Sequence, residues 1–270
     1  MKSFTKRFYS FRADANALGG YLEEPYRTNV PTLAPVSLPA VGGFAMARSE
    51  AFTFDGIISC SLAYTRVSGR EDEKGATSTL ITAAVEDLNI LGRLTARRIV
   101  AQVSISDPNS KEPIQISREG SVFEDLRVDG QECRLKLNSE LQQPQNSNEG
   151  RGAGLLTWPG IAQVGQAQAR NLIQGFKRWG TAAHEWVEKR HGNPQPGSIL
   201  CSLVDGIEGC GDSICSGHML DIRGFGRVTL GELRVSGDSV QLVMLRADLG
   251  CPVTGGVTIS CVGGGGTGDN

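Results

Sequence analysis

The sequence predicts a mainly β protein, an antiparallel β-sandwich with an inserted amphipathic helical segment. Three observations favour this fold class. Apolar and polar residues alternate with a period of two, turn sequences separate the alternating stretches, and a helical period occurs in one segment. A chain of 270 residues can also bury a sizeable core. A parallel β-roll, or solenoid, is the alternative, because evenly spaced strands near 80–105 would show the same alternation.

The first strand-rich part of the β-domain covers residues 44–137. Alternation is clearest from Ile99 to Ile105, which predicts a half-buried strand. The pair Asp129-Gly130 supplies the positive φ angles that a type I′ hairpin turn needs, so it predicts a hairpin.

Residues 1–43, which precede this part, are expected to form a proline-rich N-terminal arm. Proline fixes φ and removes a donor from a strand ladder, so such a segment favours an extended arm or a sheet edge over a helix. The prolines concerned are Pro25, Pro31, Pro35 and Pro39.

Residues 138–198 are expected to form a polar linker and a helical insertion. After Trp158-Pro159 the apolar residues recur with a helical period, which predicts an amphipathic helix that packs on the sheet. Gly180 interrupts this run, and Thr181 can cap a second short helix. The predicted apolar stripe of the first helix consists of Ala169, Leu172, Ile173, Phe176 and Trp179.

Residues 199–262 return to strand patterns and form the second part of the predicted β-domain. Val228 and Leu230 alternate with polar residues, and so do Leu233 and Val235. Residues 263–270 are rich in glycine, and we expect them to form a flexible tail. A phosphate-binding loop is not expected there, because such a loop needs a helix after its glycines.

Three blocks of the sequence resemble the choice-of-anchor P family of bacterial surface proteins. They are residues 82–101, residues 120–130 and residues 221–232, in the order in which the family has them. Turn glycines and alternating apolar positions carry this resemblance. It implies a β-domain displayed on or outside a cell, and it implies no catalytic residues. Residues 138–218, which separate the second block from the third, depart from the family pattern.

Composition limits the classes of partner. The formal net charge is −2, and Lys and Arg are scattered, so the sequence lacks the basic patch that binds nucleic acid. No apolar run is long enough for a transmembrane segment. Residues 1–14 begin with basic residues but contain no apolar core of a signal peptide. A cytoplasmic location is the default expectation, whereas the family resemblance implies the cell surface.

The seven cysteines raise the question of a metal site. In a reducing compartment they are expected to be small buried apolar residues, so no cofactor is expected. The alternative is a zinc site, because thiolate and imidazole groups are zinc ligands, although a Cys-x2-Cys pair is missing. Its candidate ligands are Cys201, Cys210, Cys215 and His218.

A second metal candidate consists of His184, Glu188 and His191. On a helix these three residues share one face, yet they lack the His-Glu-x-x-His order of metalloproteases. That face lies away from Trp186 and Val187, which predicts a charged outer surface. The sequence also lacks a Gly-x-Ser-x-Gly motif, so an α/β-hydrolase has no support.

Two functions from different classes therefore stay open. The first is a non-catalytic structural or binding module, which could also self-assemble into a homo-oligomer through its edge strands. The second is a metalloprotein or enzyme with its site in residues 184–218. We favour the first, because strand patterns dominate the chain and no enzymatic motif is present.

Overall fold

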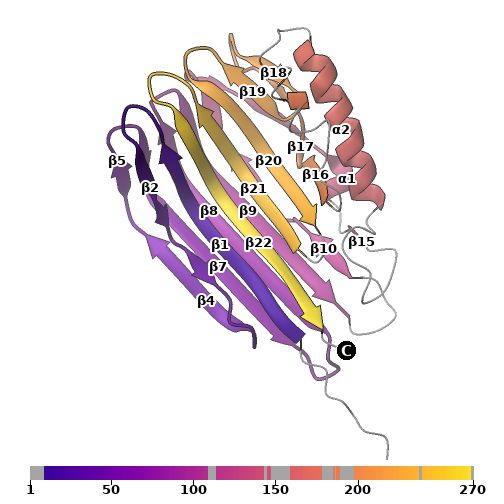
Figure 1. The fold of residues 1–270 in the computed structure, drawn as a ribbon. Helices are drawn as coiled ribbons and strands as arrows, with labels where there is room; N and C mark the ends of the chain where they lie inside the picture. Colours follow the sequence, from indigo (N-terminus) through magenta and orange to yellow (C-terminus); the bar gives the residue numbers. More distant parts are fainter. Residues whose placement is uncertain are drawn as a thin grey trace, which may run out of the picture.

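Two antiparallel sheets lie face to face and enclose one apolar core, as the computed structural model shows (Figure 1). The predicted antiparallel β-sandwich is therefore confirmed. All the strand pairs described are antiparallel, which excludes the parallel β-roll. The structure describes residues 9–108, 114–142, 145–146, 159–177, 185, 187–188, 198–236 and 239–268.

The first sheet contains the two ends of the described chain side by side, because β1 pairs with β22. Its strands follow one another in the order β18-β19-β20-β21-β22-β1-β2, with β16 beside β20 and β3 beside β1. Their bounds are β1 Tyr9–Leu22, β2 Thr28–Leu33, β3 Val36–Ser37, β16 Ser198–Ser202, β18 Ile214–Ser216, β19 Met219–Ile222, β20 Gly226–Ser236, β21 Ser239–Leu249 and β22 Gly255–Gly268.

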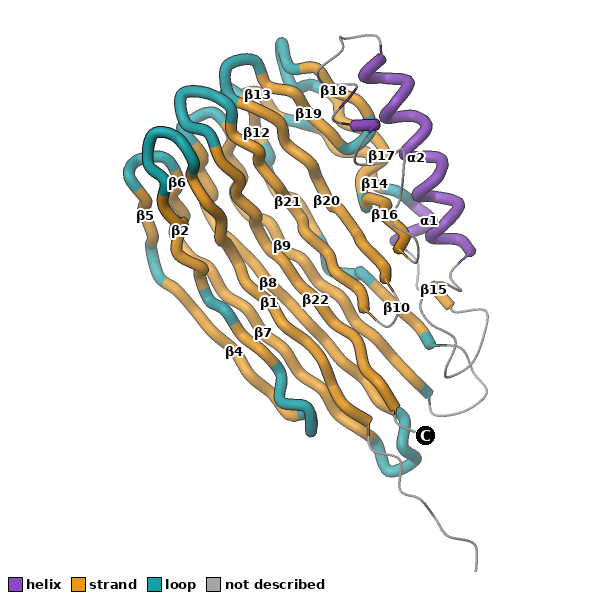
Figure 2. Tube along the Cα trace, in the orientation of Figure 1, coloured by secondary structure: helices purple, strands orange, loops and turns teal. Residues whose placement is uncertain are grey.

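The second sheet is built around the long hairpin β8–β9 (Figure 2). β7 joins β8 to the edge strand β4, and several short strands extend the sheet beyond β9. Its strands are β4 Gly43–Ser49, β5 Phe52–Phe54, β6 Ile58–Cys60, β7 Leu62–Glu71, β8 Thr77–Ile90, β9 Leu94–Asp107, β10 Gln115–Ser117, β11 Val122–Glu124, β12 Arg127–Val128, β13 Gln131–Glu132 and β15 Gln145–Asn146.

A separate two-stranded ladder stands next to the sandwich and consists of β14 (Arg134–Leu137) and β17 (Val204–Glu208). It joins the end of the first strand-rich part to the beginning of the second. Arg134 lies opposite Glu208, and Leu137 lies opposite Val204. This short ladder positions the cavity and the thiol groups described below.

The alternation and the hairpin turn predicted from the sequence are both present. In β9, Ile99, Ala101 and Val103 are buried and face the core. The turn between β12 and β13 consists of Asp129 and Gly130, whose φ angles are 49° and 78°. Both values are positive, as a type I′ turn requires.

The N-terminal part differs from the predicted arm. β1 is a long inner strand that pairs with β22 on one side and with β2 and β3 on the other. Alternate residues of β1 are buried, namely Phe11, Ala13, Ala15 and Ala17. The edge-strand expectation holds for β2 and β3, which both pair with β1 at this edge of the sheet.

The glycine-rich C-terminus is the clearest correction, because residues 263–268 are the last part of β22 and not a flexible tail. Gly265 lies between Arg12 of β1 and Ser239 of β21. A Cβ on Gly264 would collide with the side chain of Ile81 from the opposite sheet. The glycines therefore fit a place where the two sheets approach closely.

Two helices are described: α1 (Ser139–Gln142) and α2 (Pro159–Lys177), which lies against β16 and β18 (Figure 1). Leu172 and Phe176 of the predicted stripe are fully buried, whereas Trp179 lies outside the described residues. Leu172, Phe176, Val187 and Met219 form a small second apolar cluster. None of the described helices has the length and apolar character needed to cross a membrane.

Gly165 allows α2 to approach β16 closely, and Gly165→Ala is expected to destabilise the protein. In an open helix, Gly→Ala adds about 1 kcal/mol of stability. Here the added Cβ would lie 2.6 Å from the Leu200 carbonyl oxygen, which belongs to the backbone. We expect a net loss of about 1–3 kcal/mol in urea unfolding. Gln166→Ala, on the exposed side of the same turn, is the control. A gain for Gly165→Ala would contradict the packing described.

Candidate functional site

A polar cavity of about 540 Å³ lies between α2, α1 and the β14–β17 ladder. It is the candidate binding site, because polar and charged groups from all of these elements converge on it. Eleven residues line the cavity: Lys136, Asn138, Glu140, Gln163, Val164, Ala167, Gln168, Arg170, Asn171, Asp205 and Gly217.

The carboxylate of Asp205 is the centre of the hydrogen-bond network in this cavity. The Asn138 amide nitrogen donates to both carboxylate oxygens, at 3.0 and 2.9 Å. The Gln168 amide nitrogen donates to Oδ1 of Asp205 at 2.7 Å. Two side-chain amides therefore fix Asp205 in place before any ligand binds. One comes from Asn138, which directly follows β14, and the other from Gln168 of α2.

Gln168 is itself fixed by the backbone of β16. Its amide nitrogen donates to the Ser202 carbonyl at 2.9 Å, and its amide oxygen accepts from the Ser202 N–H at 2.7 Å. Gln168 is only 7% exposed, and Ser202 is fully buried. A side-chain amide that pairs with both the N–H and the C=O of one residue satisfies the buried backbone in the way a neighbouring strand would.

The short helix α1 is anchored at both ends. At its start, the Asn138 amide oxygen accepts from the Leu141 N–H at 2.8 Å, as an N-cap residue does. At its end, the guanidinium of Arg118 donates to the Leu141 carbonyl through Nε and a terminal nitrogen, at 2.9 and 2.7 Å. Burial lowers the pKa of Arg118 to about 10, which leaves it charged at neutral pH.

The lining is balanced in charge. Lys136 and Arg170 are cationic, and Glu140 and Asp205 are anionic. Among the lining residues described there is no Ser, Cys or His. The arrangement can therefore hold a polar molecule through ion pairs and hydrogen bonds.

The four predicted zinc ligands lie in different places. Cys201 is buried in β16 opposite Leu233, and burial raises its pKa to about 12, so it is a thiol at neutral pH. His218 is buried in the turn between β18 and β19. Among all the residues described, no group of three or more His, Cys, Asp or Glu is arranged to hold a metal ion. The zinc site stays a prediction that the described geometry does not support.

The structure brings Cys210 and Cys215 together with a cysteine that was not among the candidates. Cys210 lies with its Sγ 2.6 Å from Sγ of Cys133. Cys215 lies within hydrogen-bonding reach of Cys210. These three residues, Cys133, Cys210 and Cys215, are called the thiol cluster below.

The second metal candidate can be placed only in part. His184 and His191 lie outside the described residues. Glu188 is exposed, and Val187 is fully buried against α2, which agrees with a polar outer face beside an apolar inner one. A metal site at these positions stays a prediction.

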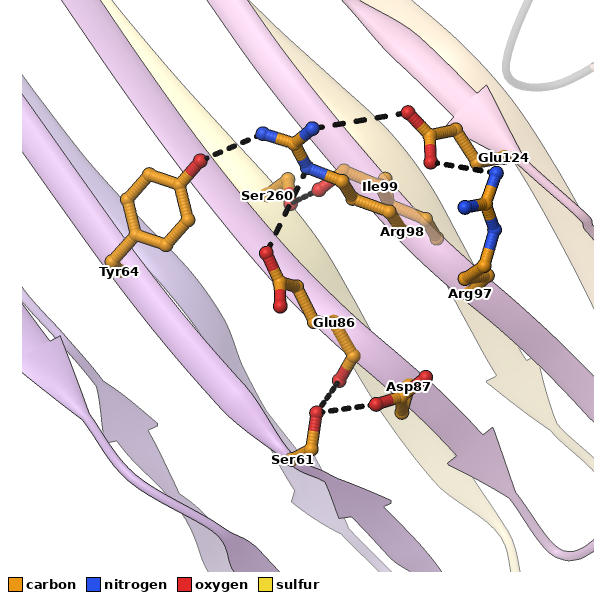
Figure 3. A network of polar contacts seen from close by, with 9 residues as sticks. All are labelled: Ser61, Tyr64, Glu86, Asp87, Arg97, Arg98, Ile99, Glu124 and Ser260. Carbon is orange, nitrogen blue, oxygen red and sulfur yellow. Dashed lines mark hydrogen bonds and ion pairs between the residues drawn. The ribbon is translucent and has the colours of Figure 1, made fainter.

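A network of charged side chains on the outer face of the second sheet is the other polar cluster (Figure 3). Arg98 donates to the Tyr64 hydroxyl at 3.0 Å and lies 3.9 Å from Glu86 and 3.8 Å from Glu124. Glu86, Arg98 and Glu124 are directly opposite one another on β8, β9 and β11. The network pairs its charges internally across the strands, so we assign it to strand register and not to ligand binding.

The edge strand β4 carries exposed apolar side chains, which is where the predicted self-association would be expected. Phe44 and Met46 are 53% and 62% exposed, and the guanidinium of Arg66 lies over the Phe44 ring. A homo-oligomer stays a prediction.

The cavity residues were missed in the sequence, although one of them left a signal. Gln168 occupies a position of the helical period between Val164 and Leu172, on the apolar side of α2. A polar residue in the apolar stripe of an amphipathic helix indicates a buried hydrogen-bond partner. Asp205 and Asn138 gave no comparable signal, because they meet only through the β14–β17 pairing.

Comparison with known proteins gives one match. The model of a family described as "Domain of unknown function (DUF8256)" matches residues 8–236. No curated protein and no solved structure matches the chain. The resemblance to the choice-of-anchor P family stays a prediction.

Proposed function

The chain belongs to the family described as a domain of unknown function (DUF8256), and on its own geometry we propose that it is a non-catalytic binding module. Its ligand is a small zwitterion, such as a free amino acid or a dipeptide, held in the polar cavity. The observation that supports this proposal most is the fixed carboxylate of Asp205, which shares a cavity of about 540 Å³ with Lys136 and Arg170.

The ammonium group of the ligand is assigned to Asp205. A carboxylate has about four acceptor positions, and Asp205 uses three of them for Asn138 and Gln168. The remaining position can accept a hydrogen bond from an ammonium group. Since Asn138 and Gln168 already hold the carboxylate in place, little side-chain entropy is lost when the ligand binds.

The carboxylate of the ligand is assigned to Lys136 and Arg170. Both side chains are exposed at the cavity, and both are permanent donors at neutral pH. Neutral sugars fit this lining less well, because no aromatic side chain is among the lining residues described. The volume is within the range of cavities that hold small ligands.

The proposal is tested by isothermal titration of the whole chain with amino acids, dipeptides and neutral monosaccharides. We expect heat of binding for the zwitterions only. Arg170→Ala should weaken the binding about tenfold, because a charge-assisted hydrogen bond is worth about 1.5–3 kcal/mol. An amine analogue without a carboxylate should bind wild type and Arg170→Ala equally.

Arg70→Ala, which replaces an exposed arginine at the end of β7, is the matched control and should leave the affinity unchanged. Two results would overturn the proposal. One is the absence of binding by any zwitterion at concentrations of about 1 mM. The other is binding of the zwitterions that is equally strong in Arg170→Ala, Lys136→Ala and wild type.

A further inference from the structure

Cys133 meets Cys210 and Cys215, which lie far from it in the sequence, beside the β14–β17 ladder. Cys133 directly precedes β14, and Cys210 follows β17 after one glycine. Arg134 and Glu208 form the last pair of this antiparallel ladder. Cys133 and Cys210, which lie just beyond this pair, are therefore at the same end of the ladder. Their Sγ atoms are 2.6 Å apart, and both residues are buried.

The backbone on either side is packed closely, so the meeting of the two sulfur atoms does not depend on side-chain rotamers alone. A Cβ on Gly209 would lie 2.8 Å from the Glu132 carbonyl oxygen. A Cβ on Gly211 would lie 2.9 Å from Oε1 of the Gln131 side chain, which can move. The loop after β17 therefore lies directly against the β12–β13 hairpin, which Cys133 follows.

The third thiol makes this site more than a pair. Cys215 belongs to β18, is only half-buried, and lies within hydrogen-bonding reach of Cys210. Cys210 donates to Cys133. The contacts with Cys210 lower the pKa of Cys133 and of Cys215, and the same contacts raise the pKa of Cys210. The two outer cysteines are thus the better thiolates, and Cys210 lies between them.

We propose that the thiol cluster is a thiol–disulfide exchange site, in which Cys210 can form a disulfide either with Cys133 or with Cys215. The oxidant is a small disulfide of the glutathione class. Cys215 is the entry point because it is the most accessible of the three, and Cys133–Cys210 is the buried product.

The electrons and protons balance over three steps. The Cys215 thiolate attacks one sulfur of the external disulfide, forms a mixed disulfide and releases the first small thiolate, which takes a proton from water. Cys210 then loses its proton to water, attacks the Cys215 sulfur and releases the second small thiolate, which is protonated in turn. Finally, the Cys133 thiolate attacks Cys210, forms Cys133–Cys210 and releases Cys215 as a thiolate. Two electrons pass from Cys133 and Cys210 to the external disulfide, which becomes two thiols.

The distance between the sulfur atoms favours exchange over metal binding. Two thiolates on one tetrahedral zinc ion, each about 2.3 Å from the metal, lie about 3.8 Å from each other. Cys133 and Cys210 are closer than that. Cys201, the remaining cysteine among the candidate zinc ligands, lies in β16 opposite Leu233 of β20 and is not part of the thiol cluster.

The test begins with the reduced wild-type chain, so that it does not depend on the folding of a variant. The protein is exposed to oxidised glutathione, alkylated, digested and mapped by mass spectrometry. We expect a Cys133–Cys210 cross-link as the main product. Cys133→Ser should give a Cys210–Cys215 cross-link instead, and Cys210→Ser should keep glutathione on Cys215. Cys215→Ser should form Cys133–Cys210 roughly tenfold more slowly.

Cys261→Ser, which removes a buried thiol of β22, is the matched control and should leave the products and their rate unchanged. The exposed Cys251 reports whether the oxidant is active. The proposal is overturned if Cys133, Cys210 and Cys215 all stay alkylated as free thiols while Cys251 carries glutathione. It is also overturned if the rate of cross-linking is the same with and without Cys215, or if elemental analysis finds one equivalent of a metal that all three thiols release on alkylation.

Discussion

Removal of residues 263–270 is expected to lower the free energy of unfolding by about 5 kcal/mol or more. This segment includes the last part of β22, which has a partner strand on each side. Tyr9 to Asp14 of β1 lie opposite residues 263–268, and Ser239 to Gln241 of β21 lie opposite residues 263–265. The truncation removes the hydrogen bonds of both ladders, each worth about 1 kcal/mol net, and leaves two open strand edges in the middle of the sheet.

Chemical denaturation of the truncated chain measures this loss, and the accessible edges should also increase aggregation. Removal of Asn270 alone is the control, because it leaves the described part of β22 intact. If residues 263–270 were a flexible tail, their removal would not change the free energy of unfolding. Equal unfolding midpoints for the truncated and the complete chain would therefore show that residues 263–268 do not belong to the sheet.

Formation of the Cys133–Cys210 disulfide is expected to raise the free energy of unfolding by about 4 kcal/mol. The two residues are 77 positions apart, and their cross-link would close a loop that contains α1, α2 and β16. A closed loop of this length strongly restricts the unfolded chain, whereas the folded chain already holds the two sulfur atoms side by side. The measurement is urea unfolding of the oxidised and the reduced protein.

The alternative disulfide of the thiol cluster gives an internal comparison. Cys210 and Cys215 enclose only a few residues, so oxidised Cys133→Ser should gain only about 2 kcal/mol. A reductant should abolish both gains. If the oxidised wild type is no more stable than the reduced protein, the disulfide either strains the β14–β17 ladder or does not form.

The strands were predictable wherever large apolar residues alternate with polar ones, as they do in β8, β9 and β20. The same rule failed where the inward-facing residues are small. In β1, Ala13, Ala15 and Ala17 alternate with polar residues, yet alanine has a low strand propensity, so this pattern does not predict a strand. In β22 the glycines show no alternation of apolar and polar residues. Ile81 lies so close to Gly264 across the core that there is no room for a Cβ at that position.

The candidate site was less predictable because long-range pairing assembles it. Asn138 and Asp205 are far apart in the sequence, and so are Cys133 and Cys210. A one-residue slip in the β14–β17 register would separate both pairs, and no local signal in the chain specifies that register. Spacing between cysteines in the sequence therefore pointed to Cys201 and His218, whereas the structure selects Cys133.

The pairing of β1 with β22 also determines the order of events during biosynthesis. Gly19 and Thr258 are joined by a hydrogen bond across 239 positions, so β1 leaves the ribosome long before its partner β22. Until then both neighbours of β22 have an unsatisfied edge, and contacts between such distant positions form slowly. A nascent chain of this protein should therefore need a holding chaperone until translation has passed β22.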